Sequence, residues 1–256
     1  MYEITKVHAI AKSRKARISA AVGALCLLGI VVALILGRDA PSPPEPTPSG
    51  PAEGVTFFDI GQNTPLTPPL RDRLENELGP AVTERWADLD LNINYPGFLK
   101  EHFPELADLN GTLKDEYAPM RPEEKPVKLT FRHTGAKETP FQRVDLVFSP
   151  YTRRPIFFRI QPKKGEGAAV VETIQKKYGS HGEIQWDDEI PWDGRSGKTL
   201  VWRRNGDLLT VTVSPDRYGD PSYLIAIYYV KNLKKTAETK AENQAKREDN
   251  GLKKAF

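Results

Sequence analysis

Cysteine is nearly absent from this sequence: its 256 residues include one, Cys26, which lies inside a hydrophobic run. The rest of the chain can form no disulfide and offers no thiolate as a nucleophile or zinc ligand. Many extracellular domains of eukaryotes use disulfides, whereas bacterial periplasmic domains of this size often do without them. We therefore expect a bacterial protein. Cys26 lacks the apolar residue three positions earlier that usually precedes a lipidated cysteine, so we interpret it as a buried thiol.

Histidine is also scarce, and the four that are present do not have the spacing of a metal site. No HExxH pattern occurs, and His102-x-x-Glu105 is half of a ligand pair at most. Residues 194–199 end like a phosphate-binding loop, but Trp192 stands where its first glycine is needed. No G-x-S-x-G elbow is present. The sequence therefore predicts no cofactor and no metal, and it identifies no catalytic residue.

The chain has little net charge where it is expected to fold. Its formal net charge is +3, but residues 1–17 and 231–256 carry +4 each and residues 38–54 carry −2. Residues 55–230 are therefore left with −3. A slightly acidic domain has no average attraction to a phosphate backbone, so no nucleic-acid partner is expected.

What the sequence does contain is a run of twenty uncharged residues, Ile18 to Gly37. A helix of this length spans about 30 Å, which matches the hydrocarbon thickness of a bilayer. Basic residues crowd its N-terminal flank, whereas acidic residues follow its C-terminal flank. The positive-inside rule therefore predicts a single-pass protein of the bacterial inner membrane, with a cytoplasmic N-terminus and a periplasmic C-terminal domain.

A cleaved signal peptide has the same order of charge and hydrophobicity, but its apolar core is about 7–15 residues long and ends in a small-x-small site. Here the run is longer and leads into residues 36–39, which form a poor cleavage site. We therefore predict an uncleaved anchor. Small residues recur at every fourth position at Gly29, Ala33 and Gly37, a spacing that permits anchor-mediated self-association.

Composition divides the chain into six segments. Six prolines between the anchor and the expected domain favour an extended linker over a recognition motif. The expected segments are a cytoplasmic basic N-terminus (1–17), the transmembrane helix (18–37), the Pro-rich linker (38–54), a mainly helical N-terminal part of the soluble domain (55–126), an antiparallel sheet with a packed helix (127–230), and a charged tail that is helical or disordered (231–256).

Within the domain, the hydrophobic period changes from that of helices to that of strands near residue 127. We expect a helix over residues 67–78, with leucine at every fourth position and a Gly-Pro pair after its end. Shorter helices are expected at about 97–103 and 104–111, and a short strand or extended segment at 86–93. After residue 127, alternation predicts strands, and these are followed by one amphipathic helix and a polar loop. The expected strands are 127–132, 144–148 and 156–160, the helix is about 166–178, and the loop is 180–198.

Asn205-Gly206 is the clearest local signal, because this dipeptide favours a two-residue type I′ hairpin. The register that follows places Arg204 opposite Asp207, Trp202 opposite Leu209, and Leu200 opposite Val211. The last strand, 223–230, is apolar on both faces and is expected either to be central or to pack against something on each side. Together the elements predict an α+β fold with a mainly antiparallel sheet, in the order ββ(β)-α-βββ, one helix packed on a face of the sheet, and several short helices.

One stretch of the expected loop combines aromatic rings with carboxylates, which is a pattern that can bind a sugar or a peptide. The alternatives are a solvated acidic loop and tryptophans that cap the domain's own core. The acids do not have the EF-hand spacing that would indicate calcium. The candidate binding residues are Trp186, Asp187, Asp188, Trp192 and Asp193.

From these observations we expect a periplasm-facing envelope protein that acts by binding or assembly. Its partners would be the membrane and an envelope protein or cell-wall component, which would bind at the aromatic stretch or at an exposed sheet edge. One alternative is a membrane-tethered hydrolase acting on cell-wall or polysaccharide material, which requires a cleft with converging carboxylates or histidines. Another is a structural subunit of a membrane complex.

Overall fold

The structure is a computed structural model that describes residues 54–85, 89–114, 124–132, 139–187 and 196–255. The chain divides into two compact units, Met1–Gly50 and Pro51–Phe256, and all described residues belong to the second. The expected anchor therefore lies outside the described residues. Across the described ranges, no helix has both the length and the apolar character needed to span a bilayer.

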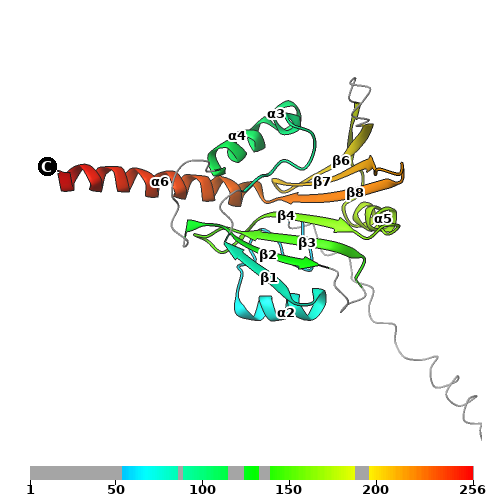
Figure 1. The fold of residues 1–256 in the computed structure, drawn as a ribbon, viewed down its shortest axis with the longest axis horizontal. Coiled ribbons are helices and arrows are strands. Elements are labelled where there is room, and N and C mark those ends of the chain that lie inside the picture. The colour runs from blue at the N-terminus through cyan, green and yellow to red at the C-terminus, as the bar shows by residue number, and fades with distance from the viewer. Residues whose placement is uncertain (1–53, 86–88, 115–123, 133–138, 188–195, 256) are drawn as a thin grey trace, which may run out of the picture. The chain divides into compact units, whose positions relative to one another are not determined.

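The described residues form an α+β fold built on one antiparallel sheet of eight strands (Figure 1). The strand order is β1-β2-β3-β4-β8-β7-β6-β5, so β8 lies centrally and β1 and β5 form the two edges. A central place for β8 was one of the two arrangements expected from its apolar faces. The strands are β1 (Ala81–Arg85), β2 (Val127–Arg132), β3 (Phe141–Phe148), β4 (Pro155–Pro162), β5 (Gly182–Asp187), β6 (Ser196–Arg204), β7 (Asp207–Pro215) and β8 (Pro221–Tyr228).

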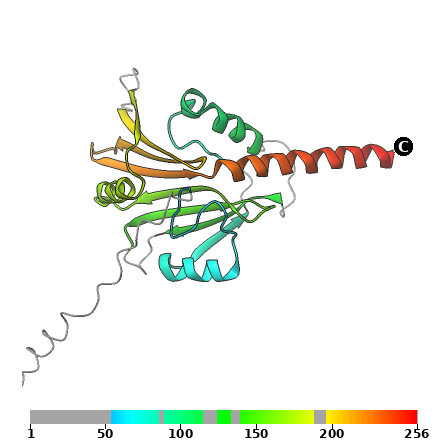
Figure 2. The same ribbon diagram turned by 180° about the vertical axis from the view of Figure 1, so that it is seen from behind.

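Helices cover both faces of the sheet, whereas the sequence suggested one covered face (Figures 1 and 2). On one side, here called the α5 face, lie α2 (Pro68–Leu78) and α5 (Gly167–Tyr178). On the other side, the α4 face, lie α3 (Phe98–His102), α4 (Pro104–Leu113) and the start of α6 (Val230–Ala255). The domain is therefore a three-layer structure with two separate hydrophobic cores.

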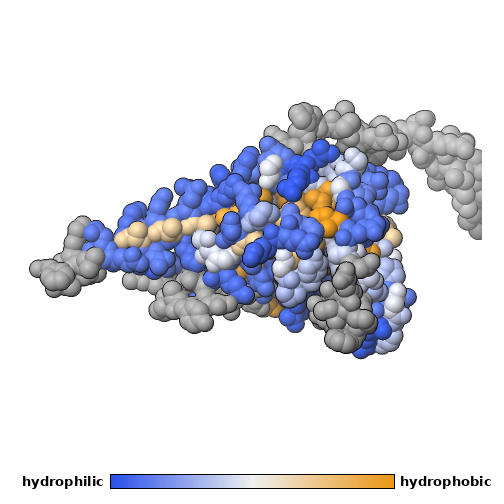
Figure 3. Space-filling model, turned by 90° about the horizontal axis from the view of Figure 1, so that it is seen from above, coloured by the Kyte–Doolittle hydropathy of each residue, from blue (hydrophilic) through white to orange (hydrophobic). Residues whose placement is uncertain are grey.

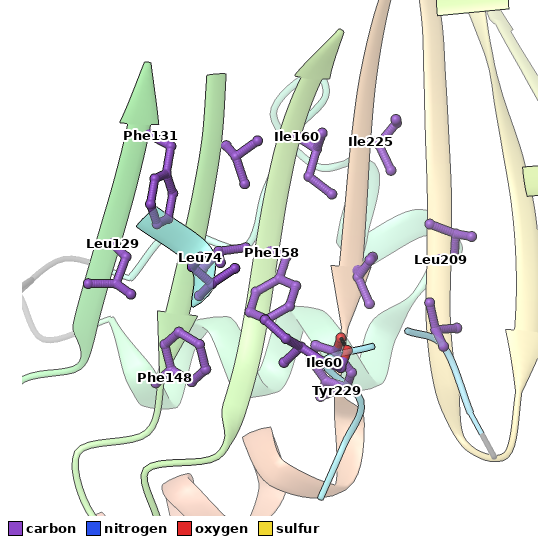
Figure 4. Packing of buried hydrophobic residues seen from close by; sticks show 14 of the residues in the cluster. Ile60, Leu74, Leu129, Phe131, Phe148, Phe158, Ile160, Leu209, Ile225 and Tyr229 are labelled. Atoms are coloured by element: carbon purple, nitrogen blue, oxygen red, sulfur yellow. Dashed lines mark hydrogen bonds between the residues drawn. The ribbon is translucent and has the colours of Figure 1, made fainter. Parts of the chain in front are cut away.

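The larger core fills the α5 face. Alternate residues of the strands point toward this side, and Figure 4 shows aromatic and branched side chains from neighbouring strands meeting there. Leu74 of α2 and Ile60 from the segment before α2 are fully buried in this core. On the α4 face, Phe98 of α3, Leu106 of α4 and Leu233 of α6 are buried in the second core. Strand residues between these helices therefore have apolar partners on both sides, which explains the continuous apolar run in β8.

Several local predictions are confirmed. The Thr67 side chain accepts a hydrogen bond from Leu70 N–H and caps α2, and Gly79 follows the last helical residue. The β6–β7 hairpin has the expected register, with Arg204 opposite Asp207. Asn205 and Gly206 have φ angles of 50° and 88°, the left-handed values that a type I′ turn requires.

Both edge strands were missed. β5 occupies part of the stretch that we expected to be a loop, and four strands follow α5 instead of three. Its composition is polar because only one side of an edge strand meets the core, through Ile184 and Trp186. β1 is five residues long and exposes Val82, so it has little apolar alternation. The extended segment expected over 86–93 is not a strand in its described part, 89–93.

The charged C-terminal segment forms α6, which is 26 residues long. Its first turns are buried through Leu233 and Ala237, whereas Ala241 and Ala245 are exposed. Figure 3 shows a thin apolar row along this helix between hydrophilic side chains. Lys240 Nζ donates to the carbonyl of Thr112 in α4, so the buried part of α6 is joined to its neighbour by polar contacts as well.

Candidate functional site

Of the five candidate binding residues predicted from the sequence, the structure describes two, Trp186 and Asp187. Trp186 lies near the end of β5, where its Nε1 donates to Thr199 Oγ1 at 3.2 Å. Its ring lies 5.7 Å from that of Tyr95 and covers Gly197, so it packs on its own domain. Asp187 ends β5 opposite Ser196. The other three predicted residues, Asp188, Trp192 and Asp193, lie outside the described residues.

A different site is present on the α5 face. An open pocket of about 310 Å³ lies between α5, the segment 55–58 and the sheet. This volume is at the lower end of the range for small-molecule sites, about 300–1,000 Å³. Most of the lining is apolar: Val55, Thr56, Phe57, Phe58, Pro140, Phe141, Ile160, Val170, Thr173, Ile174, Lys177, Tyr178, Leu209, Ile225 and Ile227.

The floor of the pocket follows from the two-residue period of the strands. Ile160 of β4, Ile225 of β8 and Leu209 of β7 come from three neighbouring strands and point to the same side of the sheet (Figure 4). Ile160 is the register partner of Ile225, so the two β-branched side chains lie side by side. Branched side chains have few rotamers, which makes this a firm apolar surface.

Helix α5 supplies one wall. Val170, Ile174 and Tyr178 recur at every fourth position and therefore face the sheet together. The helix begins at Gly167, where a Cβ atom would overlap the ring of Tyr223 in β8. This glycine allows α5 to approach the sheet closely at one end. The partly buried residues further along the helix then border the pocket.

The opposite wall is the first described segment of the domain. Phe57 and Ile60 exchange two backbone hydrogen bonds, of 3.1 and 2.9 Å, across a tight turn. The two residues between them, Phe58 and Asp59, have φ angles of 46° and 59°, which are unfavourable for residues other than glycine. Residues in such strained backbone conformations cluster at active sites and at segments that clamp a ligand. The Phe57 ring meets that of Phe141 at 5.5 Å.

Two polar groups hold this wall against the rest of the domain. Thr56 N–H donates to the Tyr178 hydroxyl at 2.9 Å, and that hydroxyl donates to the Thr56 carbonyl at 3.0 Å. Val55 N–H donates to Asp207 Oδ2 at 3.1 Å. Burial raises the pKa of Asp207 from 3.8 to about 6, although the Val55 hydrogen bond and nearby Lys231 oppose the rise. The other oxygen of this carboxylate is buried and has no hydrogen-bond partner among the described residues.

Lys177 is the one charged residue among the described residues that line this pocket. Its Nζ donates to Thr56 Oγ1 at 2.7 Å and lies 5.4 Å from the centre of the Tyr178 ring. Lys177 is exposed, so its ammonium group stands at the entrance while the apolar residues form the interior. The arrangement can accept an apolar group and offers one positive charge at its rim.

A second hollow, of about 460 Å³, is polar and lies at the start of β5, beside His181, Arg203 and Arg204. Its cations already have partners within the fold. Arg204 donates to the Tyr178 carbonyl, and the Arg203 guanidinium lies 5.4 Å from the Phe103 ring. The His181 ring packs against Trp202 at 4.9 Å. We therefore take the apolar pocket as the stronger candidate.

Metal-type side chains do not converge in the part of the chain that the structure describes: no three of its His, Cys, Asp and Glu residues lie close enough to hold an ion. His102 contacts the Tyr95 hydroxyl at 3.2 Å, and Glu105 forms an ion pair with Lys234. The half pair noted in the sequence is therefore divided between separate local contacts.

Sequence reasoning missed the apolar pocket because its walls come from distant parts of the chain. The available signal was the amphipathic stripe of α5 together with Phe57-Phe58, two adjacent aromatic residues shortly after the linker.

No family model matches the chain, and no curated protein or solved structure shows significant similarity to it.

Proposed function

We propose that this chain is a single-pass protein of the bacterial inner membrane whose periplasmic domain acts by binding. The anchor would be residues 18–37, and the Pro-rich linker would lead directly into the segment that forms one wall of the apolar pocket. The observation that carries the proposal is this pocket, which is open and apolar inside, with Lys177 as the charged residue of its described lining. Pockets of this kind bind ligands by removing apolar surface from water.

The arrangement supports binding better than it supports the hydrolase alternative. Asp207 has the raised pKa that a general acid often shows, but it lies beneath Val55 and does not line the pocket. Among the fifteen described lining residues there is no carboxylate and no histidine. The described lining therefore lacks the carboxylate pair of glycoside cleavage and the histidine that activates a hydroxyl nucleophile in many peptidases.

In-cell photo-crosslinking at the pocket rim tests the proposal. A photoreactive amino acid replaces Thr173 in the full chain, and irradiation of intact cells should give an adduct with an envelope component. The same amino acid at Lys176, which is exposed on α5 outside the lining, is the matched control. Filling the pocket by Ile174→Trp should remove the Thr173 adduct. Adducts of equal yield at both positions, unaffected by the filling variant, would refute binding at this pocket.

A further inference from the structure

We propose that the pocket binds a single linear acyl chain whose anionic head group is held by Lys177. This inference rests on the proposed function and names the ligand class of the same site. It combines three features of the described residues: the size and lining of the cavity, the position of its one charge, and the contrast between Lys177 and the lysine next to it.

The size and lining favour one acyl chain. The pocket volume of about 310 Å³ lies at the lower end of the range for small-molecule sites, about 300–1,000 Å³. We therefore infer a ligand with one acyl chain and not a lipid with both chains bound. The floor residues Ile160, Leu209 and Ile225 present methyl groups, and Phe57 and Phe141 add ring edges. A sugar or a polar peptide would lose hydrogen bonds to water here without replacement, which costs free energy. A methylene chain has no such groups to lose.

The charge favours an anionic head group. Among the described residues, no carboxylate forms an ion pair with Lys177, and a hydroxyl, Thr56 Oγ1, holds its ammonium group at 2.7 Å. Lys176, one position earlier, is instead paired with Glu172 at 2.8 Å. A carboxylate or phosphate at the pocket entrance would complete the coordination of Lys177 by a charge-assisted hydrogen bond. The Thr173 hydroxyl, also in the lining, already donates to the Ala169 carbonyl at 2.9 Å, so the proposed head group relies on Lys177.

Two sources could supply this chemistry, a free fatty acid or one chain of an anionic membrane lipid. Both present an acyl chain below a negative group, and both occur in a bacterial envelope. The shared chemistry is what the pocket recognises, so the experiment offers the chain in each form.

The test uses the full chain in lipid nanodiscs and a dodecanoate probe that carries a photoreactive diazirine near its methyl end. After irradiation, peptide mapping should place the label on residues of the pocket, with Val170 and Ile174 among them. Lys177→Glu should lower labelling about tenfold or more, because it replaces a charge-assisted hydrogen bond by repulsion. Lys176→Glu, the matched control, should change labelling less than about twofold.

Pocket-filling variants and a second anionic probe keep the result interpretable. Ile174→Trp should abolish labelling, and Ile174→Phe serves in its place if the larger residue prevents folding. A second arm carries the same diazirine chain on phosphatidylglycerol within the nanodisc. Labelling of the pocket by either anionic probe supports the proposal, and the stronger of the two identifies the source.

A neutral probe separates the head-group inference from the proposed function. Dodecanol with the same diazirine should label the pocket more weakly and should be insensitive to Lys177→Glu. If it labels as strongly as dodecanoate, and Lys177→Glu has no effect on either probe, the anionic head group is refuted while binding at the pocket stands. If no probe labels the pocket but the Thr173 crosslinker captures a protein there in cells, the acyl ligand is refuted alone. If neither experiment gives an adduct, both proposals fail.

Discussion

At the scale of single residues, two side chains fix the wall that the domain presents after its linker. Asp207 accepts a hydrogen bond from Val55, and Tyr178 both accepts from and donates to Thr56. Neither contact could be located from the sequence, since 152 and 122 residues separate the partners. Both contacts have measurable consequences because each partner is buried or partly buried.

Asp207 should make the domain less stable as the pH rises. Its pKa in the folded chain is about 6, against 3.8 ordinarily, so the folded state holds the proton more tightly than the unfolded state does. The resulting stabilisation is complete below pH 3.8 and is lost as the pH rises through 6; a shift of this size corresponds to roughly 3 kcal/mol at most. Asp207→Asn should flatten this part of the curve of unfolding free energy against pH, as measured by urea denaturation.

Asp216 provides the opposite sign as a control. Backbone hydrogen bonds from Tyr218 and Asp220, helped by Lys164, lower the pKa of this partly exposed carboxyl, so its contribution is lost as the pH falls. Asp216→Asn should therefore leave the decline between pH 4 and 6.5 in place. An Asp207→Asn curve that runs parallel to that of the unsubstituted protein across this range would contradict the account of Asp207.

Tyr178→Phe should loosen the pocket wall. It removes the hydroxyl that serves both backbone groups of Thr56, and two lost hydrogen bonds of typical strength cost about 1–3 kcal/mol of unfolding free energy. Hydrogen exchange of the Thr56 amide should accelerate by more than the global change. Tyr218→Phe is the control, because Tyr218 is 70% exposed. Equal exchange rates at Thr56 in both variants would mean that the hydroxyl does not hold the wall.

At the scale of elements, the sequence predicted those features that depend on neighbouring residues alone. Asn205-Gly206 gave the hairpin register to the residue because the turn type fixes the pairing of its strands. Thr67 and Gly79 marked the ends of α2 because a side-chain cap and a glycine with positive φ act on the adjacent turn of the helix. β5 escaped prediction because its backbone pairing with β6, and not its own apolar content, makes it a strand. The pocket escaped it because no single element contains it.

The close approach of α5 to the sheet can be tested at Gly167. Gly167→Ala places a methyl group against the ring of Tyr223, so α5 must move or the ring must rotate. Overpacking of this kind typically costs about 1–3 kcal/mol, and the unfolding midpoint in urea should fall. Ala168→Ser, at the next and exposed position, should change it little. If Gly167→Ala is as stable as Ala168→Ser, the helix does not pack as tightly as described.

At the scale of the whole molecule, the proposed function depends on two parts of the chain that differ in composition, the anchor with its linker and the domain. The proposed anchor and Pro-rich linker end where the pocket wall begins, since Gly54 is followed directly by Val55. The composition of residues 38–54 favours a short extended linker. A linker of this kind is compatible with the proposal that the pocket binds an amphiphile of the membrane.

Native mass spectrometry of the full chain, released directly from bacterial inner-membrane vesicles, tests this account most directly. It predicts an uncut polypeptide of 28.7 kDa that carries a bound amphiphile, and an equally intact Ile174→Trp chain without it. A chain that lacks its first forty or so residues would contradict the anchor. Identical spectra for the two proteins, with or without bound molecules, would contradict the pocket.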